Sequence, residues 1–296
     1  MFGFCDYIIY DGALGTMLQK RGLGPGQRPD LMNVSAPGVV ESVHRMYVEA
    51  GSDIICTNTF GANATALAGT GYTPEEIITA AVSIAKRASG GRAKIALDIG
   101  PIGALLEPIG ELEYEKAYDL FAGQAKAGEK SGADLAAIET MSDITEMKAA
   151  ILAVTENTSL PVFATMTFDK TGRTYLGCTP EDFAEMAEQL GAAAVGINCS
   201  LEPETMLPTA ERIAKATSLP LIIKPNAGLP DSATGYYSIG PAEFARQMSL
   251  FDYLGEKSPG KNTAADDSPT RRLMIVGGCC GTTPDHIREL KKRYLT

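Results

Sequence analysis

Short apolar runs separated by longer segments recur along the whole chain. Eight of these runs have the length and composition of buried strands. They are Tyr7–Tyr10, Ile54–Cys56, Ile95–Ile99, Leu135–Ile138, Val162–Met166, Ala194–Ile197, Leu221–Ile223 and Leu273–Val276. Because no run exceeds five residues, the pattern predicts many short strands rather than a few long elements.

The segments between the apolar runs carry helix start and stop signals. Pro37–Ala50 is followed by Gly51, and Glu113–Ser131 is followed by Gly132, which is the expected position for a helix-ending glycine. Thr73 precedes Glu76 by three residues, the spacing of a capping box. Five more helices are expected at Asp143–Asn157, Pro180–Leu190, Pro203–Thr217, Pro241–Leu254 and Pro284–Tyr294.

Eight strands that alternate with eight helices predict a single α/β domain, a closed (β/α)8 TIM barrel over residues 1–296. The competing fold is a doubly wound open sheet, which normally shows a glycine-rich phosphate turn after its first strand. Residues 11–16, DGALGT, are only loosely like such a turn, so the barrel is favoured. Residues 255–272 are polar and rich in Pro, Gly, Ser and Asp, which predicts a flexible surface insertion.

Composition and charge narrow the class of function. The chain is 45% hydrophobic and 21% charged, as expected for a globular protein with a large core. Its formal net charge of -10 disfavours nucleic acid and anionic membrane surfaces as partners. No apolar run approaches the roughly 18 residues that span a bilayer, and the N-terminus does not resemble a signal peptide. We therefore expect a cytoplasmic protein.

Polar and thiol side chains stand where the predicted strands end. A TIM-barrel enzyme builds its active site at the carboxyl ends of its strands, so these positions are candidates for function. They are Asp11, Thr57–Asn58, Asp98, Glu139, Thr167, Asn198–Cys199, Pro225–Asn226 and residues 277–280, GGCC.

Three of the six cysteines, Cys199, Cys279 and Cys280, fall at two of these strand ends. Thiolate sulfur is a preferred zinc ligand, and three protein ligands with one open position are typical of a catalytic zinc site. The surrounding glycines allow the backbone to turn both adjacent sulfurs toward one ion. The alternative is that these cysteines are small buried apolar residues. That interpretation applies to Cys5, Cys56 and Cys178. Of the two histidines, His44 lies in the middle of a predicted helix and is expected at the surface or in an interface, and we expect neither His44 nor His286 to be a ligand.

Two carboxylates at other strand ends suit an amino-acid substrate. Asp11 and Glu139 are expected to hold its ammonium group through charge-assisted hydrogen bonds. The backbone amides of Gly12 and Ala13 are expected to receive its carboxylate. Asn226 either completes the zinc coordination when substrate is absent or caps a loop. Structural carboxylates bonded to nearby amides are the alternative for Asp11 and Glu139.

Seven segments together resemble the homocysteine S-methyltransferase family, most closely the homocysteine-binding barrel of cobalamin-dependent methionine synthase. They are residues 11–16 (DGALGT), 57–61 (TNTFG), 98–101 (DIGP), 139–140 (ET), 196–199 (GINC), 224–228 (KPNAG) and 277–284 (GGCCGTTP). The resemblance covers nearly the whole chain. It implies that Cys199, Cys279 and Cys280 bind Zn²⁺ and that Asp11, Gly12, Ala13 and Glu139 bind homocysteine. It also implies that Asn226 occupies the open zinc position before substrate arrives.

The same resemblance implies a zinc-bound thiolate that attacks a methyl group to give methionine. The favoured donor is methylcobalamin, a methyl-corrinoid, carried on a separate protein and served by a folate-binding methyltransferase. One alternative is direct transfer from S-methylmethionine, S-adenosylmethionine or betaine, which would need an aromatic pocket. Its candidate residues are Phe60, Tyr114, Tyr175 and Tyr236. A rival of another class is a non-catalytic thiol- or zinc-binding subunit of a larger assembly.

Overall fold

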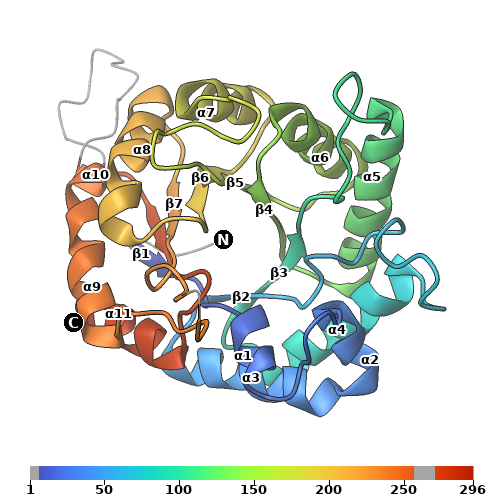
Figure 1. Cartoon of the computed structure of the whole chain (residues 1–296), viewed down its shortest axis with the longest axis horizontal. Helices are drawn as coiled ribbons and strands as arrows, with labels where there is room; N and C mark the ends of the chain where they lie inside the picture. Colours follow the sequence, from blue (N-terminus) through green and yellow to red (C-terminus); the bar gives the residue numbers. More distant parts are fainter. Residues whose placement is uncertain (1–6, 232, 257–270, 296) are drawn as a thin grey trace.

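Parallel pairing joins strand to strand around the molecule. In the computed structural model, which describes residues 7–231, 233–256 and 271–295, eight strands pair in the order β1-β8-β7-β6-β5-β4-β3-β2. They are β1 (Tyr7–Ile9), β2 (Ile54–Cys56), β3 (Lys94–Ile99), β4 (Leu135–Met141), β5 (Val162–Met166), β6 (Ala194–Asn198), β7 (Leu221–Lys224) and β8 (Met274–Val276). A parallel bridge between Tyr10 and Ile54 connects the two ends of the series. The predicted (β/α)8 barrel is confirmed (Figure 1).

Helices surround the ring of strands, as Figure 1 shows. The larger ones are α3 (Pro37–Ala50), α4 (Pro74–Ser89), α5 (Tyr114–Ser131), α6 (Ile144–Asn157), α7 (Pro180–Gln189), α8 (Pro203–Ala216), α9 (Pro241–Met248) and α11 (Pro284–Leu295). The predicted capping box is present, because the Thr73 hydroxyl accepts a hydrogen bond from the Glu76 amide and the Glu76 carboxylate accepts one from the Thr73 amide. The predicted bounds of α3 are confirmed, and Gly51 ends it with a φ of 104°.

Alternating side chains divide the core into two layers. Ile8 and Tyr10 point to the barrel interior, whereas Ile9 packs in the layer between strands and helices. Such alternation is the two-residue period of a strand. Gly196 on β6 is required by close packing, since a Cβ there would lie 1.9 Å from the carbonyl oxygen of Ile222. The filled interior leaves the strand ends as the place for a site.

Short elements and one helix break were not predicted. The additional elements are α1 (Gly15–Gln19), η1 (Pro29–Leu31), α2 (Met32–Ser35), η2 (Ser249–Phe251) and α10 (Asp252–Glu256). Each spans about one turn, which is too short for apolar periodicity to reveal. The helix expected over 241–254 is interrupted after Met248 by η2 and continues as α10, and the Ser249 hydroxyl donates to the Arg246 carbonyl at this break.

The predicted insertion is shorter than expected at both ends. Gly255 is buried in α10, and Arg272 is buried with its guanidinium donating to the carbonyl oxygens of Ala214 and Thr217. These two residues therefore belong to the packed protein rather than to a polar surface loop. Residues 257–270, the rest of the predicted insertion, lie outside the described residues. Within the described part of the chain, no helix is long and apolar enough to cross a membrane.

Candidate functional site: three thiols and a buried charge cluster

A cavity of about 450 Å³ opens at the carboxyl ends of the strands. Its wall includes residues near or just after the carboxyl ends of β1, β2, β3, β4, β6, β7 and β8, and most of the predicted site residues are among them. These are Asp11, Gly12, Ala13, Glu139, Cys199, Cys279 and Cys280. Residues far apart in the sequence thus share one wall because parallel strands end at the same rim.

A larger hollow of about 580 Å³ lies at the opposite, amino-terminal ends of β1 to β4. Its charged side chains include two ion pairs, Lys94 with Asp134 at 2.8 Å and Lys291 with Asp53 at 2.9 Å. The cysteines do not line it. Since this end of a barrel serves stability, we place the candidate site in the smaller cavity.

The three thiols meet as predicted. The sulfur atoms of Cys199, Cys279 and Cys280 all lie within 4.8 Å of one another, and those of Cys199 and Cys280 are 3.9 Å apart. In the described part of the chain this is the sole cluster of His, Cys, Asp and Glu side chains with metal-ligand spacing. Cys199 has a φ of 62°, a left-handed conformation that is strained for cysteine and turns its side chain toward the neighbouring loop.

Glycines shape the loop that carries the adjacent pair. A Cβ on Gly278 would lie 2.5 Å from the Thr282 side chain, and Gly281 has a φ of 81°. The Thr282 hydroxyl donates to the Cys279 carbonyl at 2.7 Å, and the Cys279 amide donates to the Pro225 carbonyl at 2.8 Å. The loop is therefore held in one conformation by the contacts that the small residues permit.

The thiols compete for negative charge. Hydrogen bonds from Cys199 and Cys279 lower the pKa of the Cys280 thiol to about 3. Hydrogen bonds with Cys199 and Cys280, together with burial, raise the pKa of Cys279 well above its ordinary value. One thiolate is thus stabilised by two neighbouring thiols. A bound dication would allow all three sulfurs to ionise, because it compensates their mutual repulsion.

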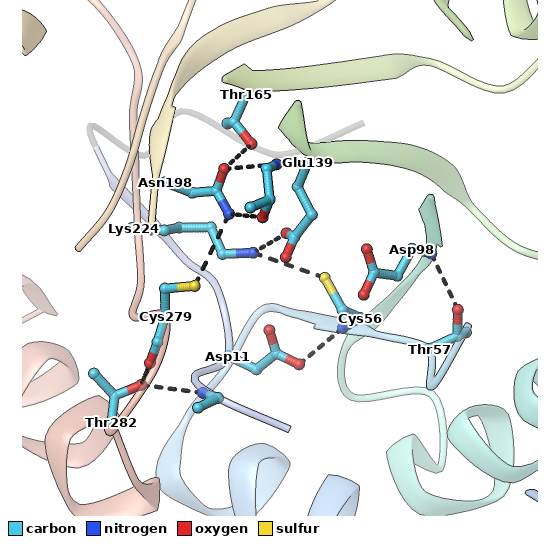
Figure 2. Close-up of polar contacts among 12 residues, drawn as sticks. Asp11, Cys56, Thr57, Asp98, Glu139, Thr165, Asn198, Lys224, Cys279 and Thr282 are labelled. Atoms are coloured by element: carbon cyan, nitrogen blue, oxygen red, sulfur yellow. Dashed lines mark hydrogen bonds and ion pairs between the residues drawn. The ribbon is translucent and has the colours of Figure 1, made fainter. Parts of the chain in front are cut away.

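Asn198, at the end of β6, links the thiol cluster to the backbone next to Glu139. Its amide oxygen accepts hydrogen bonds from the Thr140 amide and the Thr165 hydroxyl, both at 2.9 Å. Its amide nitrogen donates to the Thr140 hydroxyl at 2.7 Å and to the Cys279 sulfur at 3.9 Å (Figure 2). Thr140 has a φ of 62° and follows Glu139, so Asn198 fixes a strained backbone beside that carboxylate.

Replacing Asn198 with alanine should therefore destabilise the protein by about 2–4 kcal/mol, because two hydroxyls and one amide lose a buried partner. Urea denaturation measures this change. Thr165→Val removes only one of the partners of the Asn198 oxygen and should cost about 1 kcal/mol. Equal losses in the two variants would show that the amide does not organise this part of the site.

A buried lysine that the sequence patterns did not single out lies at the centre of the charge cluster. The Lys224 ammonium, at the end of β7, contacts the Glu139 carboxylate at 2.5 Å, and the two side chains are 5% and 14% exposed. It also lies 3.9 Å from the Cys56 sulfur and 4.5 Å from the centre of the Tyr10 ring. Cys56 is a buried core residue, as expected, and it also lines the cavity. The available signal for Lys224 was a charged residue directly after an apolar run.

Asp11 is almost completely buried, and its carboxylate accepts a hydrogen bond from the Cys56 amide at 2.8 Å. Burial raises the pKa of Asp11 to about 7, although the Lys224 charge and the Cys56 amide oppose the change. Of the two amides predicted to bind a carboxylate, that of Ala13 already donates to the Thr282 hydroxyl at 3.0 Å. Gly12 lines the cavity beside it.

The raised pKa of Asp11 predicts a pH-dependent stability difference. Between about pH 4 and pH 7 the folded protein holds a proton on Asp11 that the unfolded chain has released. The free energy of unfolding therefore falls as the pH rises through this range, and the contribution of the bound proton is gone above about pH 7. Asp11→Asn has no carboxyl group at this position, so its stability does not fall with pH for this reason. The variant should gain about 2–3 kcal/mol relative to the wild type between pH 5 and pH 8, as measured by urea denaturation. A pH-independent difference would mean that Asp11 titrates normally.

Comparison with known proteins identifies the family of this chain. The family model for homocysteine S-methyltransferase matches residues 8–294. The chain belongs to the homocysteine S-methyltransferase family. Two curated relatives are methionine synthases from Mycobacterium leprae and Mycobacterium tuberculosis, each 32% identical over 304 residues. The alignments cover 96% of this chain and 24% of each relative, so the chain spans about a quarter of their length.

Solved structures show the same fold. The homocysteine methyltransferase MmuM from Escherichia coli, in its metallated form, has a TM-score of 0.79 and 22% sequence identity, with 98% of this chain and 97% of that chain covered. Its oxidized form matches equally well. The predicted membership of the homocysteine S-methyltransferase family and the predicted barrel are thus both confirmed.

Asn226, which the family resemblance suggests as an additional metal ligand, lies beside the thiol loop. The residues on either side of it, Pro225 and Ala227, form backbone hydrogen bonds with Cys279 and Cys280. Asn226 is buried, and its side-chain oxygen has no hydrogen-bond partner within the described structure. A buried oxygen without a partner is costly, so this atom is suited to a ligand that binds there.

Other residues of interest fall outside the family's candidate site. His44 was expected at the surface or in an interface, but it is fully buried, and burial lowers its pKa to about 4. It is a core residue, because it lies four residues from both Val40 and Val48 and so shares the buried face of α3. Among the four aromatic candidates for a methyl pocket, only Phe60 lines the cavity; Tyr175 and Tyr236 are 89% and 69% exposed. Cys5 lies outside the described residues.

Proposed function

We propose that this protein binds homocysteine and a zinc ion and transfers a methyl group to the homocysteine sulfur, giving methionine. One observation carries the proposal. The three thiols of Cys199, Cys279 and Cys280 lie on the wall of the same cavity as the buried carboxylates of Asp11 and Glu139. A soft metal site and an ammonium site in one cavity suit a ligand that has a thiol at one end and an amino group at the other.

The donor set fits zinc. Four-coordinate zinc with Zn–S bonds of about 2.3 Å places its sulfur ligands about 3.8 Å apart, and Cys199 and Cys280 are 3.9 Å apart. Cys199, Cys279 and Cys280 would hold the ion, and the unpartnered oxygen of Asn226 would serve as a further ligand when substrate is absent. Bound zinc would lower the pKa of a substrate thiol, so that the nucleophilic thiolate forms at neutral pH.

The side chains of this chain would orient the substrate. Asp11 and Glu139 offer carboxylate oxygens to the ammonium group, and the backbone near Gly12 offers a place for the carboxylate. Lys224 fixes Glu139 by an ion pair, and Asn198 fixes the backbone next to it. Holding the amino acid at both ends restricts the approach of its sulfur to the methyl donor, which lowers the entropic part of the barrier.

A methyl-corrinoid on a separate protein or domain is the favoured donor. The chain spans about a quarter of its methionine synthase relatives, which leaves room in those proteins for other functions. Exposed apolar side chains occur on loops that leave the carboxyl ends of the strands, as expected for a surface that contacts a macromolecule. They include Phe60, Leu105, Ile109, Tyr175, Leu229 and Tyr236.

A small sulfonium or ammonium donor has less support. It would need several aromatic faces around its cationic methyl group, and of the four predicted aromatic residues only Phe60 lines the cavity. A non-catalytic zinc-binding subunit has less support as well, since such a protein has no use for the buried carboxylates Asp11 and Glu139.

Methyl-transfer assays separate these possibilities. Zinc-loaded protein is incubated with homocysteine and, in parallel, methylcobalamin, S-methylmethionine, S-adenosylmethionine or betaine, and methionine is measured by mass spectrometry. We expect methionine with methylcobalamin. Methionine formed only with a small donor would replace the corrinoid in the proposal. No methionine with any donor, while zinc and homocysteine both bind, would favour the non-catalytic subunit.

A further inference from the structure

Asp98 is a buried carboxylate with an unsatisfied oxygen at the cavity wall. It lies near the end of β3, lines the cavity and is 8% exposed. Its backbone is held on both sides, because its amide donates to the Thr57 hydroxyl at 3.1 Å and its carbonyl accepts from the Thr59 hydroxyl at 2.7 Å. Its side-chain Oδ1 has no hydrogen-bond partner within the described structure. The carboxylate is thus rigidly placed without a partner of its own (Figure 2).

The surrounding charges are unbalanced. Three carboxylates lie here, from Asp11 two residues after β1, Asp98 on β3 and Glu139 on β4. Lys224 contributes one ammonium. Lys224 is bonded to Glu139, and Asp11 has the amide of Cys56. Asp30 is the other carboxylate whose charge acts on Asp98. It accepts a hydrogen bond from the Gly61 amide at 3.0 Å and contacts Arg28. Asp98 alone among these carboxylates lacks a donor.

An uncompensated carboxylate in a buried site is unfavourable, and burial followed by the charge of Glu139 raises the pKa of Asp98 well above its ordinary value. A cationic hydrogen-bond donor in the cavity would both compensate the charge of Asp98 and bond to its free oxygen. Metal ions do not suit this position well, since one carboxylate oxygen beside a lysine ammonium is a poor cation cage. A ligand ammonium, with three N–H donors in a compact group, fits the missing role.

We propose that Asp98 binds the ammonium group of the amino-acid substrate directly and selects thiols that carry an α-amino group. The inference rests on the proposed function and adds a substrate contact to it. Glu139 also offers an oxygen to the ammonium group, but Lys224 already compensates its charge. Asp98 is the carboxylate whose free oxygen would accept a hydrogen bond from the substrate ammonium, with Asp11 beside it.

The test compares two ligands in wild-type protein and in Asp98→Asn, each loaded with zinc. Homocysteine carries the amino group and 4-mercaptobutyrate lacks it, and calorimetric titration gives both affinities. Loss of one charge-assisted hydrogen bond should weaken homocysteine binding roughly 10- to 150-fold. The affinity for 4-mercaptobutyrate should change by less than about twofold, because that ligand never makes the bond. Zinc content should be unchanged.

Asp30→Asn is the matched control. Asp30 also lines the cavity and is 3% exposed, but its carboxylate already has partners, so its replacement should leave the ratio of the two affinities unchanged. Thermal melting without ligand adds a second readout. Asp98→Asn should melt at the same temperature or higher than the wild type, because it removes an uncompensated buried charge.

Equal losses of affinity for both thiols in Asp98→Asn, or a lowered melting temperature with unchanged homocysteine affinity, would overturn the inference and give Asp98 a structural role. If wild-type protein binds zinc and homocysteine and the variant binds both equally well, only the inference is wrong. If the wild-type protein binds neither, the proposed function fails and the inference fails with it.

Discussion

Replacing Cys279 with alanine should remove zinc from the protein and abolish methyl transfer. Cys279 lies with Cys199 and Cys280 within 4.8 Å, so the substitution leaves two sulfur ligands where three are available. Replacing a residue that only hydrogen-bonds to a metal ligand typically weakens metal binding roughly 10- to 100-fold. Loss of a ligand itself should therefore weaken zinc binding by more than about 100-fold. Cys199→Ala should have the same effect, because it removes the ligand that follows β6.

Elemental analysis gives the zinc content, and competition with a chelator gives the affinity. Cys178→Ala is the control, since Cys178 is a buried thiol that does not line the cavity. It should keep about one zinc per chain and normal affinity. Stoichiometric zinc in both Cys279→Ala and Cys199→Ala would contradict the assignment of the metal site.

Replacing Lys224 with methionine should destabilise the folded protein by about 3–5 kcal/mol, the usual cost of breaking a buried ion pair from one side. Lys224 is 5% exposed at its side chain and is bonded to Glu139. It is also the cation nearest to Asp11 and Asp98, whose carboxylates would then repel Glu139 without compensation. Urea denaturation of the metal-loaded protein measures the change in the free energy of unfolding.

The double variant Lys224→Met with Glu139→Gln tests whether the effect comes from the pair. It removes the carboxylate that the single variant leaves unpaired, so it should be more stable than Lys224→Met alone. Additive losses from the two single substitutions would show that the pair is not coupled. The ion pair would then be dispensable to the site.

The barrel was predictable because local and periodic signals agree. Proline and glycine mark most helix ends, such as Pro37 and Gly51 of α3, and the strands are continuous apolar runs. The thiols and carboxylates were predictable as a group for a geometrical reason. Strand ends converge at one rim, so Cys199 and Cys279 can be brought together without knowledge of any contact between them.

Contacts across the barrel interior were not predictable in the same way. The pairing of Lys224 with Glu139 joins β7 to β4, and it depends on which side chains point inward and on the register of intervening strands. The hydrogen bonds of Asn198 depend on a left-handed φ at Thr140, which no local pattern announces. His44 was misplaced because histidine is usually a partly exposed residue, although its spacing of four residues from Val40 and Val48 puts it on the apolar face of α3.

The number of sulfur atoms bound to zinc, before and after homocysteine is added, tests the central claim most directly. X-ray absorption at the zinc edge counts these neighbours. We expect three sulfurs in the protein alone, from Cys199, Cys279 and Cys280, and four when homocysteine is bound, because its thiol takes the open position. A count that stays at three when homocysteine saturates the protein would contradict thiol activation by this site.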